Sequence, residues 1–223
     1  MNYKAAFIEL MLQAKVLTFG DFVTKSGRKT PYFVNTGNYK TGEQITKLGK
    51  FYAQCIQERV GPNFDLLYGP AYKGIPLAVT TAVSLYSDHQ VNIPYCFNRK
   101  EVKDHGEGGS LIGLAPQDND RILIIEDVIT AGTSVRESWQ LLKSIADVKI
   151  TNLVVSVDRR ERGAGQQTAL QEIEAEFGIK THAIVTINEI IDYLYNREID
   201  GRVLIDDNMK LRIEDYLNQY GVA

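Results

Sequence analysis

Apolar positions near the start of the chain recur at the spacing of a helix. They lie on one face of a helix expected over residues 3–16, namely Ala6, Phe7, Leu10, Met11 and Ala14. The next twenty residues mix β-branched and aromatic side chains with turn residues, which predicts short strands or a hairpin over 17–36. A second helix is expected to begin at Thr41 and to end near Val60, because a Gly-Pro pair follows.

From residue 64 onward, short apolar runs alternate with helical patterns. The predicted strands cover 64–68, 93–98, 121–125, 149–157 and 181–187. The predicted helices cover 75–86, 133–146, 167–177, 188–196 and 207–219. Strands that are almost continuously apolar and alternate with helices are typical of a parallel sheet covered on both faces. Ligands of such folds bind beyond the carboxyl ends of the strands, so we expect a site after Tyr68, Asn98, Ile125 and Val157.

Composition narrows the class of protein. The 223 residues are 44% hydrophobic and 24% charged, which indicates a soluble globular chain, and the net charge of -3 argues against a general nucleic-acid binder. Cys55 and Cys96 form no metal-ligand cluster with the three histidines, which predicts ordinary thiols in a reducing compartment. No stretch approaches the roughly 18 apolar residues of a transmembrane helix and the first residues show no targeting pattern, so a cytoplasmic location is expected.

The strongest chemical signal follows the apolar run that ends at Ile125. Two carboxylates, Glu126 and Asp127, come first, and a turn of small residues over 130–134 then opens a helix. Such a turn presents backbone N–H groups at the positive end of a helix dipole, where a phosphate can bind. Phosphate would repel the carboxylates, so they need donors or a cation, such as ribose hydroxyls or Mg²⁺ through water. The segment therefore predicts a site for a ribose 5-phosphate. A buried strand before an ordinary capped helix is the alternative.

Two further segments carry cations after predicted strands. In the turn over 69–74, backbone N–H groups and Lys73 could hold a second anion, although a solvated lysine is the simpler alternative. The segment 99–109 contains cations and a histidine and then loosens into glycines, which suits a mobile flap that closes over a diphosphate. Its charged residues of interest are Arg99, Lys100, Lys103 and His105. A solvated charge run is again the alternative.

Together these motifs resemble those of a known enzyme family. The segment 122–134 is similar to the motif by which type I phosphoribosyltransferases bind 5-phosphoribosyl 1-diphosphate (PRPP). The segment 95–109 is very similar to the catalytic loop of the orotate phosphoribosyltransferases within that family. The segments 25–33 and 156–163 resemble their N-terminal hood, "K-S-G-R-K-x-P-Y-F", and their "S-x-D-R-x-E-R-G" motif. The resemblance runs from about Leu17 to the final helix.

This resemblance implies a fold, a reaction and partners. The fold is α/β of the type I phosphoribosyltransferase kind, a central mainly parallel sheet flanked by helices. It forms one domain over 1–223, with a hood formed mainly by about 1–40 and a flap over about 99–110. The implied reaction transfers 5-phosphoribosyl from PRPP to N1 of orotate in pyrimidine biosynthesis, giving orotidine 5′-phosphate and diphosphate. Mg²⁺ would be held mainly by PRPP and water without a direct protein ligand. A homodimer is implied, in which the flap reaches the neighbouring active site.

The resemblance also assigns residues. Those implied to contact PRPP are Lys25, Tyr72, Lys73, Arg99, Lys100, Lys103, His105, Glu126, Asp127, Val128, Ile129, Thr130, Ala131, Gly132, Thr133 and Ser134. Those implied to contact orotate are Phe33, Val34, Thr130 and Arg159, with Arg159 on the carboxylate. Catalytic roles are implied for Lys103, His105, Arg99 and Asp127. Lys103 would stabilise charge on the departing diphosphate, and His105 could donate to it near neutral pH. Family members commonly have two aromatic residues at 33 and 34, so Val34 departs from the pattern.

Three other interpretations stay open. The chain could transfer phosphoribosyl to another base such as a purine, although the Arg159 and hood motifs argue against this. It could be a non-catalytic regulator that senses PRPP, but such a protein is expected to carry a basic face or an added nucleic-acid-binding module. It could be a relative of PRPP synthetases, but no ATP-binding signature is found.

Overall fold

A six-stranded sheet runs through the computed structural model, which describes residues 3–24, 27–103 and 109–222, with the backbone alone at 101–103. Its strands are β3 (Leu66–Tyr68), β4 (Tyr95–Lys103), β5 (Gly109–Gly113), β6 (Arg121–Ile125), β7 (Lys149–Asp158) and β8 (Lys180–Thr186). They lie in the order β5-β4-β3-β6-β7-β8. All neighbours are parallel except β5, which pairs antiparallel with β4. The predicted α/β fold with a mainly parallel sheet is confirmed.

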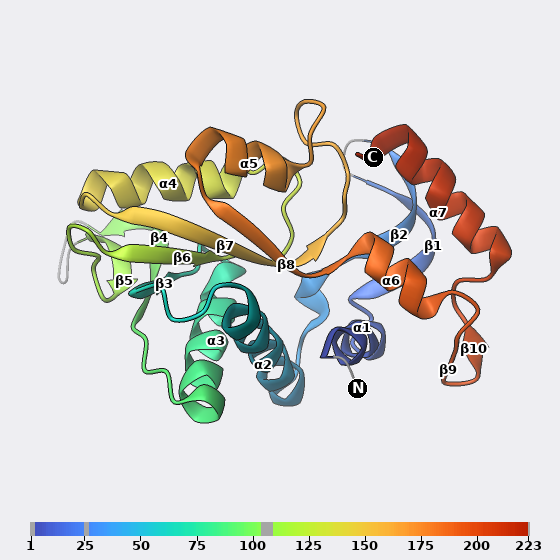
Figure 1. The fold of residues 1–223 in the computed structure, drawn as a ribbon, viewed down its shortest axis with the longest axis horizontal. Helices are drawn as coiled ribbons and strands as arrows, with labels where there is room; N and C mark the ends of the chain where they lie inside the picture. The colour runs from blue at the N-terminus through green and yellow to red at the C-terminus, as the bar shows by residue number, and fades with distance from the viewer. Residues whose placement is uncertain (1–2, 25–26, 104–108, 223) are drawn as a thin grey trace.

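Helices cover both faces of this sheet (Figure 1). The α-helices of the described residues are α1 (Tyr3–Gln13), α2 (Gly42–Arg59), α3 (Gly74–His89), α4 (Thr133–Ile145), α5 (Ala169–Phe177), α6 (Ile187–Leu194) and α7 (Asp207–Tyr220). Helices α4 and α5 lie on one face, and α2 and α3 lie on the other. The buried core divides accordingly, with Leu142 and Ile173 in the cluster on the α4 and α5 side and Tyr52 and Leu85 in the other.

Local sequence explains where these elements begin and why the central strands are buried. The apolar residues 122–125 of β6 have no exposed surface, as expected for a strand with helices on both faces. Helix α2 begins with a capping box, in which the Thr41 hydroxyl accepts the Gln44 N–H and the Gln44 side chain accepts the Thr41 N–H. Thr168 and Thr186 begin α5 and α6 in the same way.

The expected hairpin near the N-terminus is present. Strands β1 (Leu17–Val23) and β2 (Lys29–Val34) pair antiparallel, and a short 3-10 helix, η1 (Thr36–Asn38), leads on toward α2. The last helix, α7, packs on this hairpin, where the rings of Tyr32 and Tyr216 meet edge to face with centroids 5.8 Å apart. The two ends of the chain therefore build one side of the molecule together (Figure 1).

The structure has more strand than the sequence predicts. The sequence suggests a loop from residue 99, but β4 continues to Lys103 and β5 returns beside it. This was missed because the extension of β4 is mostly charged and β5 has only two apolar residues between glycines. A second small pair, β9 (Glu198–Ile199) and β10 (Arg202–Val203), was also not predicted. None of the helices in the described part of the chain is long and apolar enough to cross a membrane.

Gly49 allows α2 and α3 to approach closely, and this can be tested. A Cβ atom at Gly49 would lie 2.6 Å from the Thr80 carbonyl oxygen. We therefore expect Gly49→Ala to destabilise the fold by about 1–3 kcal/mol, although alanine normally favours a helix. The matched control is Gly42→Ala in the same helix, where a Cβ would meet nothing within 4 Å. Urea unfolding should show a loss for Gly49→Ala alone, and equal stability of the two variants would contradict the packing account.

Candidate active site

A cavity of about 600 Å³ opens at the carboxyl edge of the sheet, beyond the ends of β6 and β7. Five parts of the chain line it: the β1–β2 hairpin, the turn after β3, the segment after β6, the segment after β7 and the start of α5. Of the predicted site residues, the cavity is lined by Phe33, Val34, Lys73, Asp127, Val128, Ile129, Thr130, Ala131 and Arg159. Parallel strands end at the same edge of a sheet, which explains how residues so distant in sequence meet here.

The two acidic residues after β6 differ in their environment. Asp127 lines the cavity, and its Oδ2 accepts hydrogen bonds from Thr36 Oγ1 (2.5 Å) and Lys73 Nζ (2.8 Å). Glu126 does not belong to the described lining, and its Oε2 accepts the backbone N–H of Asp127 at 3.0 Å. Burial raises the pKa of the Glu126 carboxyl, and the neighbouring Asp127 charge raises it further. The sequence alone does not distinguish these two carboxylates.

Buried hydrogen bonds hold the backbone of this acidic pair. The Tyr52 hydroxyl on α2 donates to the Glu126 carbonyl oxygen at 2.7 Å. On β7, the Ser156 hydroxyl and backbone N–H donate to the Asp127 carbonyl oxygen at 2.6 and 2.8 Å. Unpaired buried polar groups are costly, so these bonds fix the position of the pair. Tyr52 was missed because its place on the apolar face of a helix gives no functional signal.

The turn before α4 has the features of an anion site. Gly132 is the N-cap residue with φ of 72°, and no side chain caps the first turn. A glycine adopts this left-handed conformation without strain, and an added Cβ would lie 3.0 Å from Ile173 Cδ1. The first backbone N–H groups of a helix have no partner within the helix and attract anions. Thr130 and Ala131, just before the turn, are exposed and line the cavity.

The turn after β3 is tied to β4 and brings a lysine to the cavity. The Asn98 side-chain oxygen accepts the Ala71 backbone N–H at 2.7 Å and the Tyr68 hydroxyl at 3.1 Å. This leaves Lys73 at the start of α3, where its ammonium group reaches Asp127. Tyr72 is 71% exposed and is not part of the cavity lining.

The remaining predicted residues lie elsewhere or outside the described part. Lys100 lines a separate cavity of about 200 Å³ together with Ser134. Arg99 is half-buried, and its Nε makes no hydrogen bond with the described residues. Thr133 is exposed, and like Gly132 and Ser134 it does not line the larger cavity. Lys25, His105 and the side chain of Lys103 lie outside the described residues.

The hairpin and the segment after β7 form the other wall. The rings of Phe22 and Phe33 stack with centroids 5.7 Å apart, which supports Phe33 at the cavity. Arg159 Nη2 lies 2.7 Å from Glu161 Oε1. Burial lowers the pKa of Arg159, but the Glu161 charge together with Tyr32 and Tyr216 outweighs burial and leaves the pKa raised. Glu161 also lines the cavity, as does Arg28. Both stand in the quoted sequence motifs, but nothing in the sequence shows that they meet.

An anion-binding helix start beside a carboxylate, at the carboxyl edge of a parallel sheet, defines an α/β protein that binds a phosphorylated sugar or nucleotide. Comparison with known proteins makes the class specific. A family model described as "Phosphoribosyl transferase domain" matches residues 35–183. An orotate phosphoribosyltransferase of Clostridium beijerinckii is 58% identical over 219 residues, with 98% of each chain covered. That of Cronobacter sakazakii is 46% identical over 220 residues, with 99% of each covered.

A solved structure agrees with these relatives. The crystal structure of orotate phosphoribosyltransferase from Francisella tularensis has a TM-score of 0.84 and 37% identity. The match covers 97% of this chain and 99% of that one. The chain thus belongs to the phosphoribosyltransferase family and, within it, to the orotate phosphoribosyltransferases.

Proposed function

We propose that this chain transfers the 5-phosphoribosyl group from PRPP to N1 of orotate, giving orotidine 5′-phosphate and diphosphate in the pyrimidine (UMP) biosynthetic route. The observation that carries the proposal is the single cavity lined by both the 127–131 segment and Arg159. The first can bind a ribose phosphate and the second can bind a carboxylate, so one cavity offers groups for both reactants. The names of the close relatives agree with this reaction.

We assign the PRPP side of the site to the segment 126–134. The N–H groups before α4 suit the 5′-phosphate, and Asp127 suits the ribose hydroxyls because its carboxylate already accepts two donors there. Tyr72 and Lys73 on the neighbouring turn would hold the diphosphate. Five residues from the hood and flap are proposed to join them when the site closes: Lys25, Arg99, Lys100, Lys103 and His105.

We assign the base side to Phe33, Val34, Thr130 and Arg159. Phe33 offers a flat apolar wall supported by Phe22, and the planar guanidinium of Arg159 matches the geometry of a carboxylate. Val34 gives a smaller wall than an aromatic residue would. Thr130 lines the same cavity and is assigned to both the PRPP side and the base side.

Mg²⁺ is the proposed cofactor. The described residues contain no group of three or more His, Cys, Asp or Glu side chains that could hold a metal ion. Mg²⁺ would be held mainly by PRPP oxygens and water, and the Asp127 carboxylate at the proposed ribose site could contact the ion through water. When bound, the ion would neutralise charge on the departing diphosphate.

The proposed mechanism is electrostatic. As the bond from C1′ to the diphosphate weakens, C1′ gains oxocarbenium character, and Asp127 holds the ribose in place. Lys103 and Arg99 stabilise the negative charge that develops on the diphosphate, and His105 can donate a proton to it. N1 of orotate then attacks C1′ from the opposite side, which inverts the configuration there.

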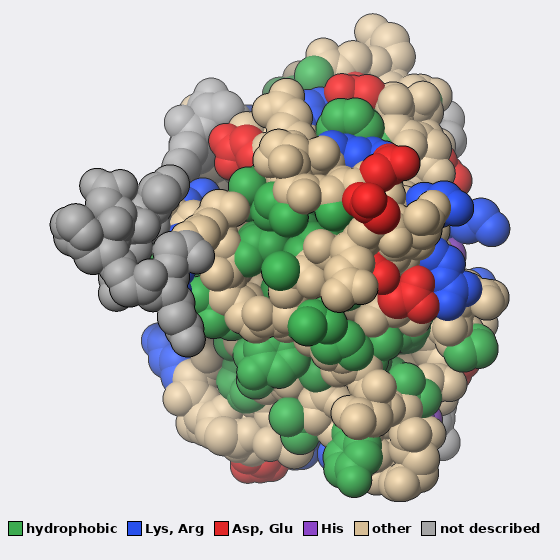
Figure 2. Space-filling model, turned by 90° about the vertical axis from the view of Figure 1, so that its left-hand side faces the viewer, with side chains coloured by type: hydrophobic (Ala, Val, Ile, Leu, Met, Phe, Trp, Pro, Cys, Tyr) green, Lys and Arg blue, Asp and Glu red, His purple; other side chains and the backbone are tan. Residues whose placement is uncertain are grey.

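We also propose a homodimer in which each flap, over about 99–110, reaches the neighbouring site. Exposed large apolar side chains occur on two neighbouring parts of the fold, α3 with Val83 (62% exposed) and Tyr86 (59%), and the β5 region with Ile112 (38%) and Leu114 (51%). Figure 2 shows the face to which these elements contribute, with hydrophobic side chains gathered across its centre. A large apolar patch on a folded chain favours burial against a partner. We further propose one domain over 1–223, with its hood over about 1–40, and a cytoplasmic location.

The reaction can be measured by the loss of orotate ultraviolet absorbance. We expect loss that requires both PRPP and Mg²⁺ and that stops on addition of a chelator. Adenine, hypoxanthine and uracil serve as parallel substrates and should not react. Turnover of another base instead of orotate would overturn the base assignment. PRPP binding without any turnover would favour a sensor.

The role of Lys103 predicts a specific kinetic change. Lys103→Ala should lower kcat by about 10²–10³-fold, because a donor to the developing charge is lost, while the KM for PRPP changes much less. The matched control is Lys149→Ala. Lys149 lies at the amino end of β7, at the opposite edge of the sheet from the cavity, and this variant should behave as wild type. Near-normal kcat in Lys103→Ala would remove Lys103 from the mechanism.

If the chain forms a dimer through this apolar patch, one charged side chain introduced into the patch should lower the mass of the particle in solution. Val83→Asp should produce monomers in sedimentation or light scattering, and turnover should fall because each flap loses its neighbour. The control is Leu211→Asp on α7, because Leu211 (58% exposed) is about as exposed as Val83. This variant should stay dimeric and active. A monomeric, fully active wild type would contradict the proposal, and so would a Val83→Asp variant that remains dimeric.

A further inference from the structure

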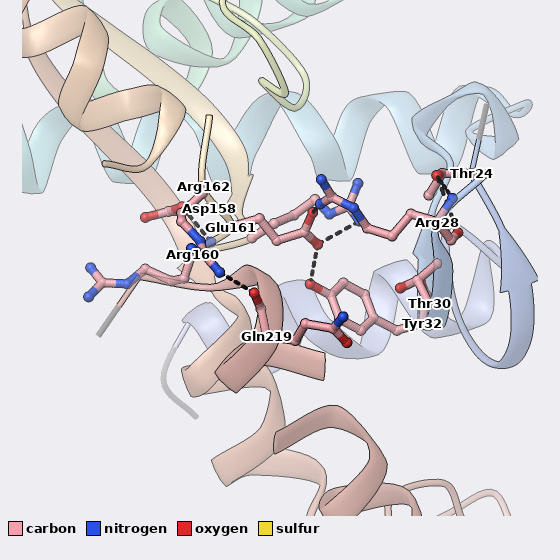
Figure 3. A network of polar contacts seen from close by, with 10 residues as sticks. Thr24, Arg28, Thr30, Tyr32, Asp158, Arg160, Glu161, Arg162 and Gln219 are labelled. Atoms are coloured by element: carbon pink, nitrogen blue, oxygen red, sulfur yellow. Dashed lines mark hydrogen bonds and ion pairs between the residues drawn. The ribbon is translucent and has the colours of Figure 1, made fainter. Parts of the chain in front are cut away.

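One carboxylate, Glu161, joins the parts of the chain that build the base side of the cavity (Figure 3). Its Oε1 accepts the Tyr32 hydroxyl at 2.7 Å and lies 2.7 Å from Arg159 Nη2. Its Oε2 accepts Arg28 Nη1 at 3.3 Å. Its side chain is only 12% exposed, so these contacts are partly shielded from solvent. We infer that Glu161 is a positioning residue that sets how Arg159 receives the orotate carboxylate, which rests on the function proposed above.

The donors to Glu161 come from distant parts of the sequence. Arg28 and Tyr32 belong to the β1–β2 hairpin, 133 and 129 residues away from Glu161. The Tyr32 ring has no exposed surface, and burial, reinforced by the Glu161 charge, raises the pKa of its hydroxyl well above the usual value. Tyr32 therefore remains protonated at any working pH and continues to donate. Glu161 thus fixes the hairpin against the sheet edge that carries Arg159.

Arg159 is held while some of its donors remain unused. Its guanidinium contacts both the Glu161 carboxylate and the Tyr32 ring, whose centroid is 5.4 Å from the guanidinium carbon. Nevertheless, Nε is buried and has no hydrogen-bond partner among the described residues. A guanidinium has five N–H donors in a rigid fork, so one carboxylate does not satisfy it. Buried donors without acceptors are costly, and a ligand carboxylate at Arg159 would relieve that cost.

The contacts of Glu161 are confined to the base side of the cavity. Glu161 contacts none of the residues assigned to the phosphate or the ribose by any described hydrogen bond or ion pair. Removal of its charge should free Arg159 and loosen the hairpin wall, but leave Asp127 and its donors unchanged. The effect should therefore fall on the KM for orotate and not on the KM for PRPP.

Glu161→Gln keeps the shape of the side chain and removes its charge. We expect the KM for orotate to rise about tenfold or more with the KM for PRPP close to wild type, and the melting temperature to fall because Arg159 loses its charge partner. The matched control is Asp65→Asn, which removes a carboxylate charge from a bidentate ion pair with Arg121 (2.8 and 2.9 Å) at the amino end of the strands. That variant should retain the wild-type KM for orotate.

A second variant tests whether Glu161 acts through the network. Tyr32→Phe removes one donor to Glu161, and it should raise the KM for orotate in the wild type but add little in Glu161→Gln. An unchanged or lower KM for orotate in Glu161→Gln would overturn the inference, and a lower value would mean that Glu161 competes with the substrate. If the KM for orotate and the KM for PRPP rise equally and the melting temperature falls, Glu161 has only a structural role, and the inference is also overturned. If the wild-type protein does not consume orotate, the proposed function itself is contradicted, and not only the role of Glu161.

Discussion

Burial of parallel strands on both faces is the constraint on which the rest of the structure depends. Residues 122–125 of β6 and 153–155 of β7 have no contact with solvent, so polar residues can follow only where each strand leaves the sheet. Because the strands are parallel, they leave at one edge. The pairing of β6 with β7 also brings Asp127 beside Ser156, whose hydroxyl and N–H hold the Asp127 carbonyl oxygen. The position of the site therefore follows from the register of the central strands.

The charges that face the cavity are compensated within the protein. Lys73 lies 2.8 Å from Asp127, and Arg159 lies 2.7 Å from Glu161. Uncompensated charges in partly buried positions would be costly, so these pairs allow the site to form before any ligand binds. The two pairs differ in exposure. Lys73 is 59% exposed and can exchange partners readily, whereas Arg159 is 12% exposed and is fixed from several sides.

Much of the fold could be predicted from the sequence because its signals are local. The apolar runs, the threonine caps and the glycine turns indicate most of the strands and helices without information on distant contacts. Strand β5 was missed because Leu111 and Ile112 form too short a pattern, and its partner β4 supplies the hydrogen bonds. The antiparallel edge strand β5 thus depends on its hydrogen bonds with β4, and the pattern of apolar residues along the sequence does not reveal such pairing.

The candidate site was predictable in its parts but not in its connections. The sequence singles out Asp127 and Arg159 by their motifs, and the structure brings both to one cavity. The sequence does not show that Asp127 lines the cavity while Glu126 is not part of the described lining, because two adjacent carboxylates give the same chemical signal. Nor does it show that Glu161 meets Arg28 across 133 residues. The roles assigned to all of the site residues remain predictions, and Lys25, His105 and the side chain of Lys103 also lie outside the described residues.

A crystal structure with orotidine 5′-phosphate bound tests the central claim most directly, because the product carries both recognised groups on one molecule. The account predicts the phosphate at the backbone N–H groups before α4 and the base carboxylate on Arg159, with the ribose hydroxyls at Asp127. A product bound outside this cavity, or one whose carboxylate faces solvent while Arg159 stays with Glu161 alone, would contradict it.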